Sequence, residues 1–240
     1  MRILITNDDS ISASQLIPLI KWCQKLGDVT AVVPKFEQSG KSHSIELHQP
    51  FEIKKLEAAP GIFIYTVDSS PADCIRYAVL GMKQSYDLVI SGINKGFNLG
   101  KDLLYSGTAG AAFEAALLGI KAIAISTAPH MYDRAIEPLD KVWAYIQEHR
   151  LLEIHDLYNI NIVPDDKGIR ITQQGGPFYS DDFIHQGNDM FMPTGKFVYE
   201  NTNDLRLDTD CVMSGYISIM PLTVNRADME IYRKLSELNN

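Results

Sequence analysis

The sequence predicts an α/β protein with a Rossmann-like three-layer fold, in which helices cover a mostly parallel central sheet and a C-terminal β-hairpin arm follows. Short apolar runs alternate with segments of helical periodicity through about residue 150, which is typical of β-α-β units. Beyond residue 155 the apolar runs are separated by loops rich in Gly, Asp and Pro, which favours hairpins. No repeat or linker divides the chain, so we expect residues 1–240 to form a single domain.

The elements between residues 1 and 150 are predicted from hydrophobic patterning and helix-start signals. Ser14 is expected to cap the first helix. A stronger signal is Ser70 followed by Pro71, with Asp73 at the capping-box position. The predicted strands are residues 2–6, 28–34, 51–55, 61–67, 87–91 and 122–126, and the predicted helices are residues 14–26, 70–82, 106–119 and 135–150.

Residues 155–240 are expected to include the hairpin arm and a C-terminal helix. The acidic pair Asp181-Asp182 follows no buried strand, so we predict that it forms a hairpin tip. The tail at 225–238 is amphipathic and is predicted to be a helix on the surface or against a partner. The predicted strands of this part are residues 160–163, 168–173, 196–200 and 215–220.

The composition argues against several classes of protein. A formal net charge of -8 over 240 residues disfavours electrostatic binding to nucleic-acid polymers or anionic membranes. Three cysteines without a CxxC pair favour free thiols in a reducing compartment over disulfides or a zinc site. The chain opens on a strand pattern instead of a secretory signal, and its least charged stretch, residues 103–120, is a poor membrane span. We therefore expect a cytoplasmic protein.

Two adjacent carboxylates, Asp8 and Asp9, directly follow the first predicted strand. In open α/β sheets ligands bind outside the carboxyl ends of the strands, so a metal or a substrate is expected here. Taken alone, such a pair is more often a solvated turn or a helix cap. Ser39 follows the second strand and Asn94 follows the strand at 87–91. If the first strand is central, all four side chains lie at one crevice.

These four side chains offer a metal only oxygen atoms. Two carboxylates, a hydroxyl and an amide carbonyl suit one hard divalent cation, Mg²⁺ or Mn²⁺, and suit zinc poorly. The predicted metal ligands are therefore Asp8, Asp9, Ser39 and Asn94. Asp8 and Asp9 are also the candidate catalytic residues, and the sequence leaves open whether Asp8 acts as a base or a nucleophile.

A glycine-rich loop at residues 92–110 leads into an alanine-rich helix. It matches neither a P-loop, because no GK[ST] ends it, nor a dinucleotide fingerprint, because G-x-G is missing. Its backbone can nevertheless approach a ligand, and the helix start can hold an anion. The candidate phosphate-binding residues are Asn98, Ser106, Gly107 and Thr108, although helix capping explains Asn98, Ser106 and Thr108 about as well. A metal beside a phosphate site indicates phosphoryl chemistry.

These motifs resemble the signatures of the stationary-phase survival protein family SurE. The resemblance implies a metal-dependent nucleotidase that hydrolyses nucleoside 5′- and 3′-monophosphates, with some activity on polyphosphate. It also implies that the metal ligands are the four residues named above. It is carried by Ile5-Thr6-Asn7-Asp8-Asp9, Ser39-Gly40, Ser91-Gly92-Ile93-Asn94 with Gly96, Asn98 and Gly100, Tyr105-Ser106-Gly107-Thr108, and a late match at Asp208-Thr209-Asp210 and residues 215–222.

One alternative and one departure accompany this resemblance. The competing hypothesis is a non-catalytic receiver-like or nucleotide-sensing protein whose acidic pair binds Mg²⁺. For the favoured enzyme we expect a nucleoside monophosphate as substrate and a homodimer or homotetramer that associates through the hairpin region. Ser10 stands where the family usually has glycine, so the loop would be shifted or strained if that position requires a positive φ.

Overall fold

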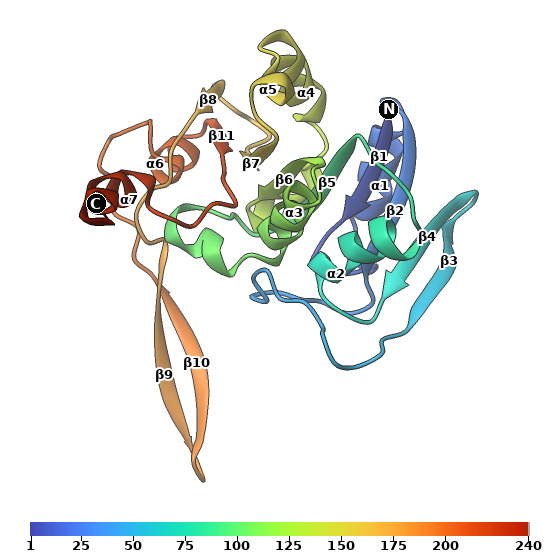
Figure 1. Ribbon diagram of the computed structural model, residues 1–240, viewed down its shortest axis with the longest axis horizontal. Helices are drawn as coiled ribbons and strands as arrows, with labels where there is room; N and C mark the ends of the chain where they lie inside the picture. The colour runs from blue at the N-terminus through green and yellow to red at the C-terminus, as the bar shows by residue number, and fades with distance from the viewer. Residues whose placement is uncertain (240) are drawn as a thin grey trace.

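The structure is a computed structural model that describes residues 1–239. Within these residues a nine-stranded sheet has the order β3-β4-β2-β1-β5-β6-β7-β11-β8 (Figure 1). Only the β3–β4 and β7–β11 pairs are antiparallel, which confirms the mostly parallel sheet. Its strands are β1 (Arg2–Thr6), β2 (Asp28–Pro34), β3 (Ile53–Ala59), β4 (Ile62–Val67), β5 (Leu88–Lys95), β6 (Lys121–Thr127), β7 (Leu157–Ile162), β8 (Ile169–Ile171) and β11 (Ile217–Pro221).

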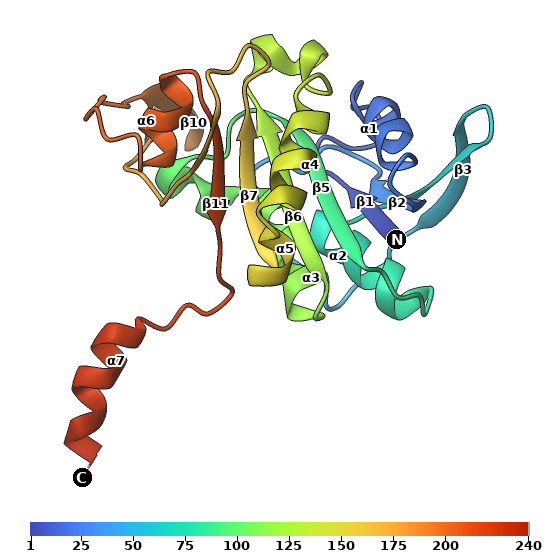
Figure 2. The ribbon, with the colours of Figure 1, turned by 90° about the horizontal axis from the view of Figure 1, so that it is seen from above.

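Helices pack on both faces of the sheet, which gives the three predicted layers (Figure 2). The alternation within β1 decides the faces: Ile3 and Ile5 pack in one core cluster and Leu4 in another, because successive strand residues point to opposite faces. The first cluster includes residues of α1 and α4, and the second includes residues of α2 and α3. The helices are α1 (Leu16–Cys23), α2 (Pro71–Arg76), α3 (Gly107–Leu117), α4 (Leu139–Glu148), α5 (Leu151–Ile154), α6 (Asp208–Met213) and α7 (Met229–Ser236).

The helix-start predictions have different outcomes. Ser70 does cap α2, since its hydroxyl accepts a hydrogen bond from Asp73 N at 3.1 Å, and Pro71 is the first helical residue. The prediction for Ser14 is wrong: α1 has Gln15 at its N-cap and no side-chain cap. The amide of Leu16 donates to the backbone oxygen of Ala13 at 3.1 Å, so a preceding turn satisfies the donor that Ser14 would have served.

The predicted hairpin arm is confirmed, but its tip lies elsewhere than predicted. Strand β9 (Tyr179–Gly187) pairs with β10 (Met190–Phe197), and the arm extends from the rest of the molecule (Figure 1). Asp181 and Asp182 lie within β9, so the prediction that they form the tip is wrong. The two residues between the strands are Asn188 and Asp189, with φ of 49° and 58°, as a two-residue hairpin turn requires.

The C-terminal helix exists but is shorter than residues 225–238. Helix α7 and the 3₁₀ turn Glu237–Asn239 follow an extended segment and stand away from the sheet (Figure 2). Its apolar residues Met229, Ile231, Tyr232 and Leu235 are all exposed. In residues 1–239 there is no helix with the length and apolar character needed to cross a membrane.

Candidate active site

Asp8 joins three elements at the carboxyl edge of the sheet. Its side chain is only 3% exposed, and its Oδ1 accepts a hydrogen bond of 2.6 Å from the Thr108 hydroxyl in the first turn of α3. The backbone oxygen of Asp8 accepts a bond of 2.8 Å from the amide of Gln38, in the loop that follows β2. The end of β1, the loop after β2 and the start of α3 therefore meet at this carboxylate.

Asp9 connects the same edge to β5. Its Oδ2 accepts a hydrogen bond of 2.8 Å from the amide of Lys95. Asn94 precedes Lys95 and donates its side-chain amide to the backbone oxygen of Gly96 at 2.7 Å, so its side-chain oxygen remains available to a ligand. The strand predicted at 87–91 continues to Lys95, which places Asn94 within β5 instead of after it.

Ser39 lies in the loop that contacts Asp8. Its hydroxyl is exposed and donates to the carboxylate of Glu37 at 2.7 Å. A donating hydroxyl keeps its lone pairs for a cation, so this bond does not disqualify Ser39 as a ligand. The position of Glu37 close to the site is a feature that the sequence reasoning missed, because a lone acidic residue in a polar loop gives no signal of its own.

The predicted phosphate-binding residues divide into two groups. Gly107 and Thr108 lie against Asp8, and a Cβ on Gly107 would stand 3.2 Å from Asp8 Oδ2, so glycine permits this close packing. The Ser106 hydroxyl caps α3 by accepting a bond of 3.0 Å from Ala109 N. Because the hydroxyls of Ser106 and Thr108 are engaged within the protein, the backbone amides at the start of α3 are the donors best suited to an anion.

Asn98 lies apart from this group. Its side-chain amide donates to the Ser126 hydroxyl at 2.7 Å, and its backbone oxygen accepts bonds of 2.9 Å from the side chains of Asn159 and Asn161. All of these partners are on β6 and β7. The structure thus assigns Asn98 an anchoring role for the glycine-rich loop, and its predicted contact with phosphate stays a prediction.

The electrostatics of the acidic pair favour a bound cation. Burial raises the pKa of Asp8 to about 6, and the charge of Asp9 adds to the shift, while the Thr108 hydroxyl opposes it. Burial also raises the pKa of Asp9, with a further contribution from Glu37, against the effect of the Lys95 amide. A divalent ion would offset both causes, because it stabilises the charged form of each carboxylate.

The donor groups fit a hard cation. Three buried side-chain oxygens near Asp8 have no hydrogen-bond partner among the described residues: Thr6 Oγ1 and Asn7 Oδ1, which precede Asp8 in the chain, and Ser91 Oγ, which lies beside Thr6 in the sheet. Such groups usually indicate a site that water or a ligand completes. Residues 1–239 contain no cluster of three or more His, Cys, Asp and Glu suited to a metal. A metal here would depend on two carboxylates and neutral oxygens, as Mg²⁺ and Mn²⁺ accept.

Ser10 adopts a left-handed backbone conformation, the case in which serine in place of glycine is expected to cause strain. Its φ is 69°, and its backbone oxygen accepts a hydrogen bond of 2.9 Å from the Asn7 side chain. The Ser10 hydroxyl accepts a bond of 3.2 Å from Ser12 N. Serine at this position therefore holds a left-handed backbone conformation, which strains a residue other than glycine.

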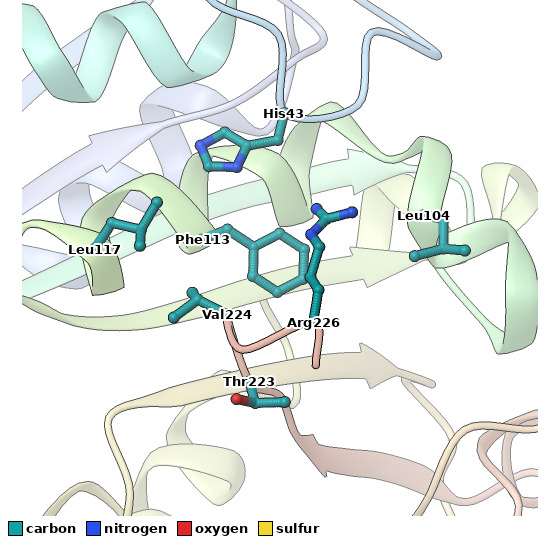
Figure 3. A pocket seen from close by; sticks show the side chains of 7 residues that line it. All are labelled: His43, Leu104, Phe113, Leu117, Thr223, Val224 and Arg226. Atoms are coloured by element: carbon teal, nitrogen blue, oxygen red, sulfur yellow. The ribbon is translucent and has the colours of Figure 1, made fainter. Parts of the chain in front are cut away.

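A small cavity elsewhere on α3 is distinct from this site. It has a volume of about 160 Å³ and lies between α3 and the segment after β11 (Figure 3). His43 lines it and binds the carboxylate of Glu114 at 2.7 Å. The lining residues are His43, Leu104, Phe113, Leu117, Thr223, Val224 and Arg226.

Comparisons with known proteins agree with the motifs and the fold. The family model described as survival protein SurE matches residues 3–181. The 5'-nucleotidase SurE of Caldanaerobacter subterraneus is 37% identical, with 98% of this chain and 96% of that protein covered. The protein of the same name from Thermoanaerobacter sp. X514 is 36% identical, with 100% and 98% covered. The crystal structure of the SurE protein from Aquifex aeolicus superposes with a TM-score of 0.82 at 28% identity over 100% of both chains.

Proposed function

Because the chain belongs to the SurE survival protein family, we propose that it is a divalent-metal-dependent nucleotidase that hydrolyses nucleoside 5′- and 3′-monophosphates. Short polyphosphate is a further candidate substrate. The observation that carries the proposal is the meeting of Asp8, Asp9 and the first turn of α3 at one sheet edge. An acidic pair beside a helix start suits a metal and a phosphate together.

The proposed metal ligands are Asp8, Asp9, Ser39 and Asn94, for one Mg²⁺ or Mn²⁺ ion. When bound, the ion supplies charge neutralisation at the phosphate and a lowered pKa of a coordinated water. Thr108 holds Asp8 Oδ1 in place through its hydroxyl, and the Lys95 amide does the same for Asp9 Oδ2. The first turn of α3 orients the phosphate through the Gly107 amide and the positive end of the helix dipole.

The proposal is tested by phosphate release from 5′-AMP, 3′-AMP and short polyphosphate with Mg²⁺ or Mn²⁺. Asp8→Asn and Asp9→Asn are each expected to lower turnover by at least about 100-fold, since even outer-shell changes at metal sites cost roughly 10- to 100-fold. Asp181→Asn, an exposed carboxylate of β9, serves as the matched control and should keep wild-type turnover.

Two results would contradict the enzyme hypothesis. One is the absence of metal-dependent phosphate release from every substrate. The other is full activity in both aspartate variants. Tight nucleotide binding in calorimetry without turnover would instead favour the non-catalytic, nucleotide-sensing alternative.

The proposal extends to assembly and location. We expect residues 1–240 to act as one domain, with the arm in residues 155–240 joining copies into a homodimer or homotetramer. Support comes from the large apolar side chains exposed on β9 and β10, because contiguous apolar surface commonly marks a protein contact. Cys23, Cys74 and Cys211 are free and buried, which supports a reducing compartment such as the cytoplasm.

A further inference from the structure

Tyr132 lies at the same sheet edge as the acidic pair, although no motif includes it. It belongs to the 3₁₀ turn Pro129–Arg134, which follows β6, and its side chain is 5% exposed. The ammonium nitrogen of Lys95 stands 5.9 Å from the centre of the Tyr132 ring. The amide of that same Lys95 binds Asp9. Lys95 therefore links the tyrosine to the candidate active site.

The hydroxyl hydrogen of Tyr132 is uncommitted. The oxygen is buried and has no hydrogen-bond partner in the part of the chain that the structure describes. The backbone amide of Gln15 approaches this oxygen without completing a bond, and an N–H there can use only a lone pair. Buried tyrosine hydroxyls usually find a partner, so this group is suited to a partner that arrives with a ligand.

The surroundings make the phenol a donor and not a base. Burial, together with the negative charges of Asp9 and Asp8, raises its pKa, so the hydroxyl stays protonated at neutral pH. Its position near the acidic pair follows from the turn after β6 and from Lys95, which contacts the tyrosine ring through its ammonium group and Asp9 through its amide. Asp9 Oδ2 and Asp8 Oδ1 already accept bonds from the Lys95 amide and from Thr108. No oxygen of the described residues accepts the Tyr132 hydroxyl hydrogen, so an oxygen of a bound ligand can act as its acceptor.

We propose that the Tyr132 hydroxyl donates a hydrogen bond to a phosphoryl oxygen of the substrate, with the Lys95 ammonium as a neighbouring cation. This inference rests on the proposed function, because it names a substrate contact at the same site. It makes Tyr132 a substrate-binding residue that the motifs do not contain. A neutral donor suits this position because it adds no charge to an edge where Asp8 and Asp9 must remain available to a metal.

The test compares Tyr132→Phe with Tyr158→Phe. Both tyrosines are 5% exposed, but the Tyr158 hydroxyl donates to the backbone oxygen of Leu151 at 2.8 Å. Tyr132→Phe should lower kcat/KM for 5′-AMP by roughly 10- to 100-fold, the loss typical of a hydrogen bond to a charged group. Its melting temperature should be unchanged or higher, because only an unpartnered hydroxyl is removed. Tyr158→Phe should show a lower melting temperature and wild-type kcat/KM.

Binding of inorganic phosphate to the Mg²⁺-loaded protein, measured by calorimetry, gives a second readout that does not require turnover. We expect Tyr132→Phe to bind phosphate at least about 10-fold more weakly than the wild type. Equal phosphate affinity, or wild-type kcat/KM in Tyr132→Phe, would overturn the inference. If the wild type binds phosphate but hydrolyses no nucleotide, the proposed function fails while the phosphate comparison still decides the role of Tyr132.

Discussion

In the sheet edge around Asp8 and Asp9, polar groups are buried, whereas in the arm of β9 and β10 apolar groups are exposed. At the edge, Thr6, Ser91 and Tyr132 each have a buried oxygen with no partner in residues 1–239. On the arm, Phe183 and Phe191 are 64% and 58% exposed. Each region lacks the kind of contact that its side chains would normally make in a folded protein.

The difference indicates what each region requires from outside the chain. An unpaired buried polar group costs about 1–3 kcal/mol, and a small polar ligand, a metal or water removes that cost. Exposed apolar surface is covered most effectively by another apolar surface, at roughly 25 cal/mol per Å². The sheet edge is therefore suited to a phosphate and a cation, and the arm to another protein chain. Changing each region by itself tests this assignment.

The largest expected effect is on assembly. Phe183 pairs with Pro193 and Phe191 with His185, so the two phenylalanines lie on one face of the arm. We expect Phe183→Ser with Phe191→Ser to convert the predicted oligomer to a monomer, as measured by light scattering after size-exclusion chromatography. Lys196→Ser, on the opposite face beside Ser180, should leave the oligomer intact. A double variant that keeps the wild-type mass would show that this face of the arm does not hold the assembly.

The next effect is on the stability of the metal-free protein. The pKa of Asp8 is raised to about 6 from 3.8, so the folded state favours the protonated carboxyl. The stability that the protonated carboxyl contributes is present below about pH 4 and is lost as the pH rises through about 6. At pH 8 the buried charge is a cost, which Asp8→Asn removes. We therefore expect Asp8→Asn to raise the free energy of unfolding by about 3 kcal/mol at pH 8 and by much less at pH 4.

Urea unfolding at the two pH values measures this difference, and Asp181→Asn gives the baseline for an exposed carboxylate. Saturating Mg²⁺ should stabilise the wild type and leave Asp8→Asn nearly unaffected, because only the wild type retains the full set of proposed ligands. A gain in stability that is equal at pH 4 and pH 8 would show that the charge of Asp8 is not its cause.

Local patterns predict the strands and the position of the acidic turn, because short apolar runs mark buried strands and Asp8 and Asp9 directly follow the first of them. The contacts that shape the site are not local. Thr108 binds Asp8 across 100 residues, and Tyr132 lies on a 3₁₀ turn for which no periodicity gives a signal. The sequence reasoning placed Thr108 in the site but assigned it to phosphate, since spacing cannot show which hydroxyls are already engaged.

The same limit explains the error in the arm. Both faces of β9 are exposed along Tyr179–Gly187, so no alternation of apolar and polar residues marks the strand. The sequence pattern of the Asp181-Asp182 pair therefore predicts a turn where the structure has a strand. The true turn depends on the positive φ of Asn188 and Asp189, and asparagine and aspartate tolerate that conformation better than most residues.

The smallest expected effect is at Ser10, within the acidic turn. A left-handed conformation costs a non-glycine residue about 1–2 kcal/mol, whereas the hydroxyl contributes only the 3.2 Å bond from Ser12 N. Glycine also loses more entropy on folding, which offsets part of the gain. We expect Ser10→Gly to raise the free energy of unfolding by up to about 1 kcal/mol, measured by urea unfolding.

Ser14→Gly provides the matched control, since Ser14 is exposed and lies in the following turn, and its φ is not positive. At that position glycine only adds conformational freedom to the unfolded chain, so the free energy of unfolding of the control should fall by roughly 0.5–1 kcal/mol. Opposite signs for the two serine-to-glycine changes would show that Ser10 is strained. Equal losses would mean that the serine contacts outweigh the strain, and that the acidic turn tolerates Ser10 without a cost in stability.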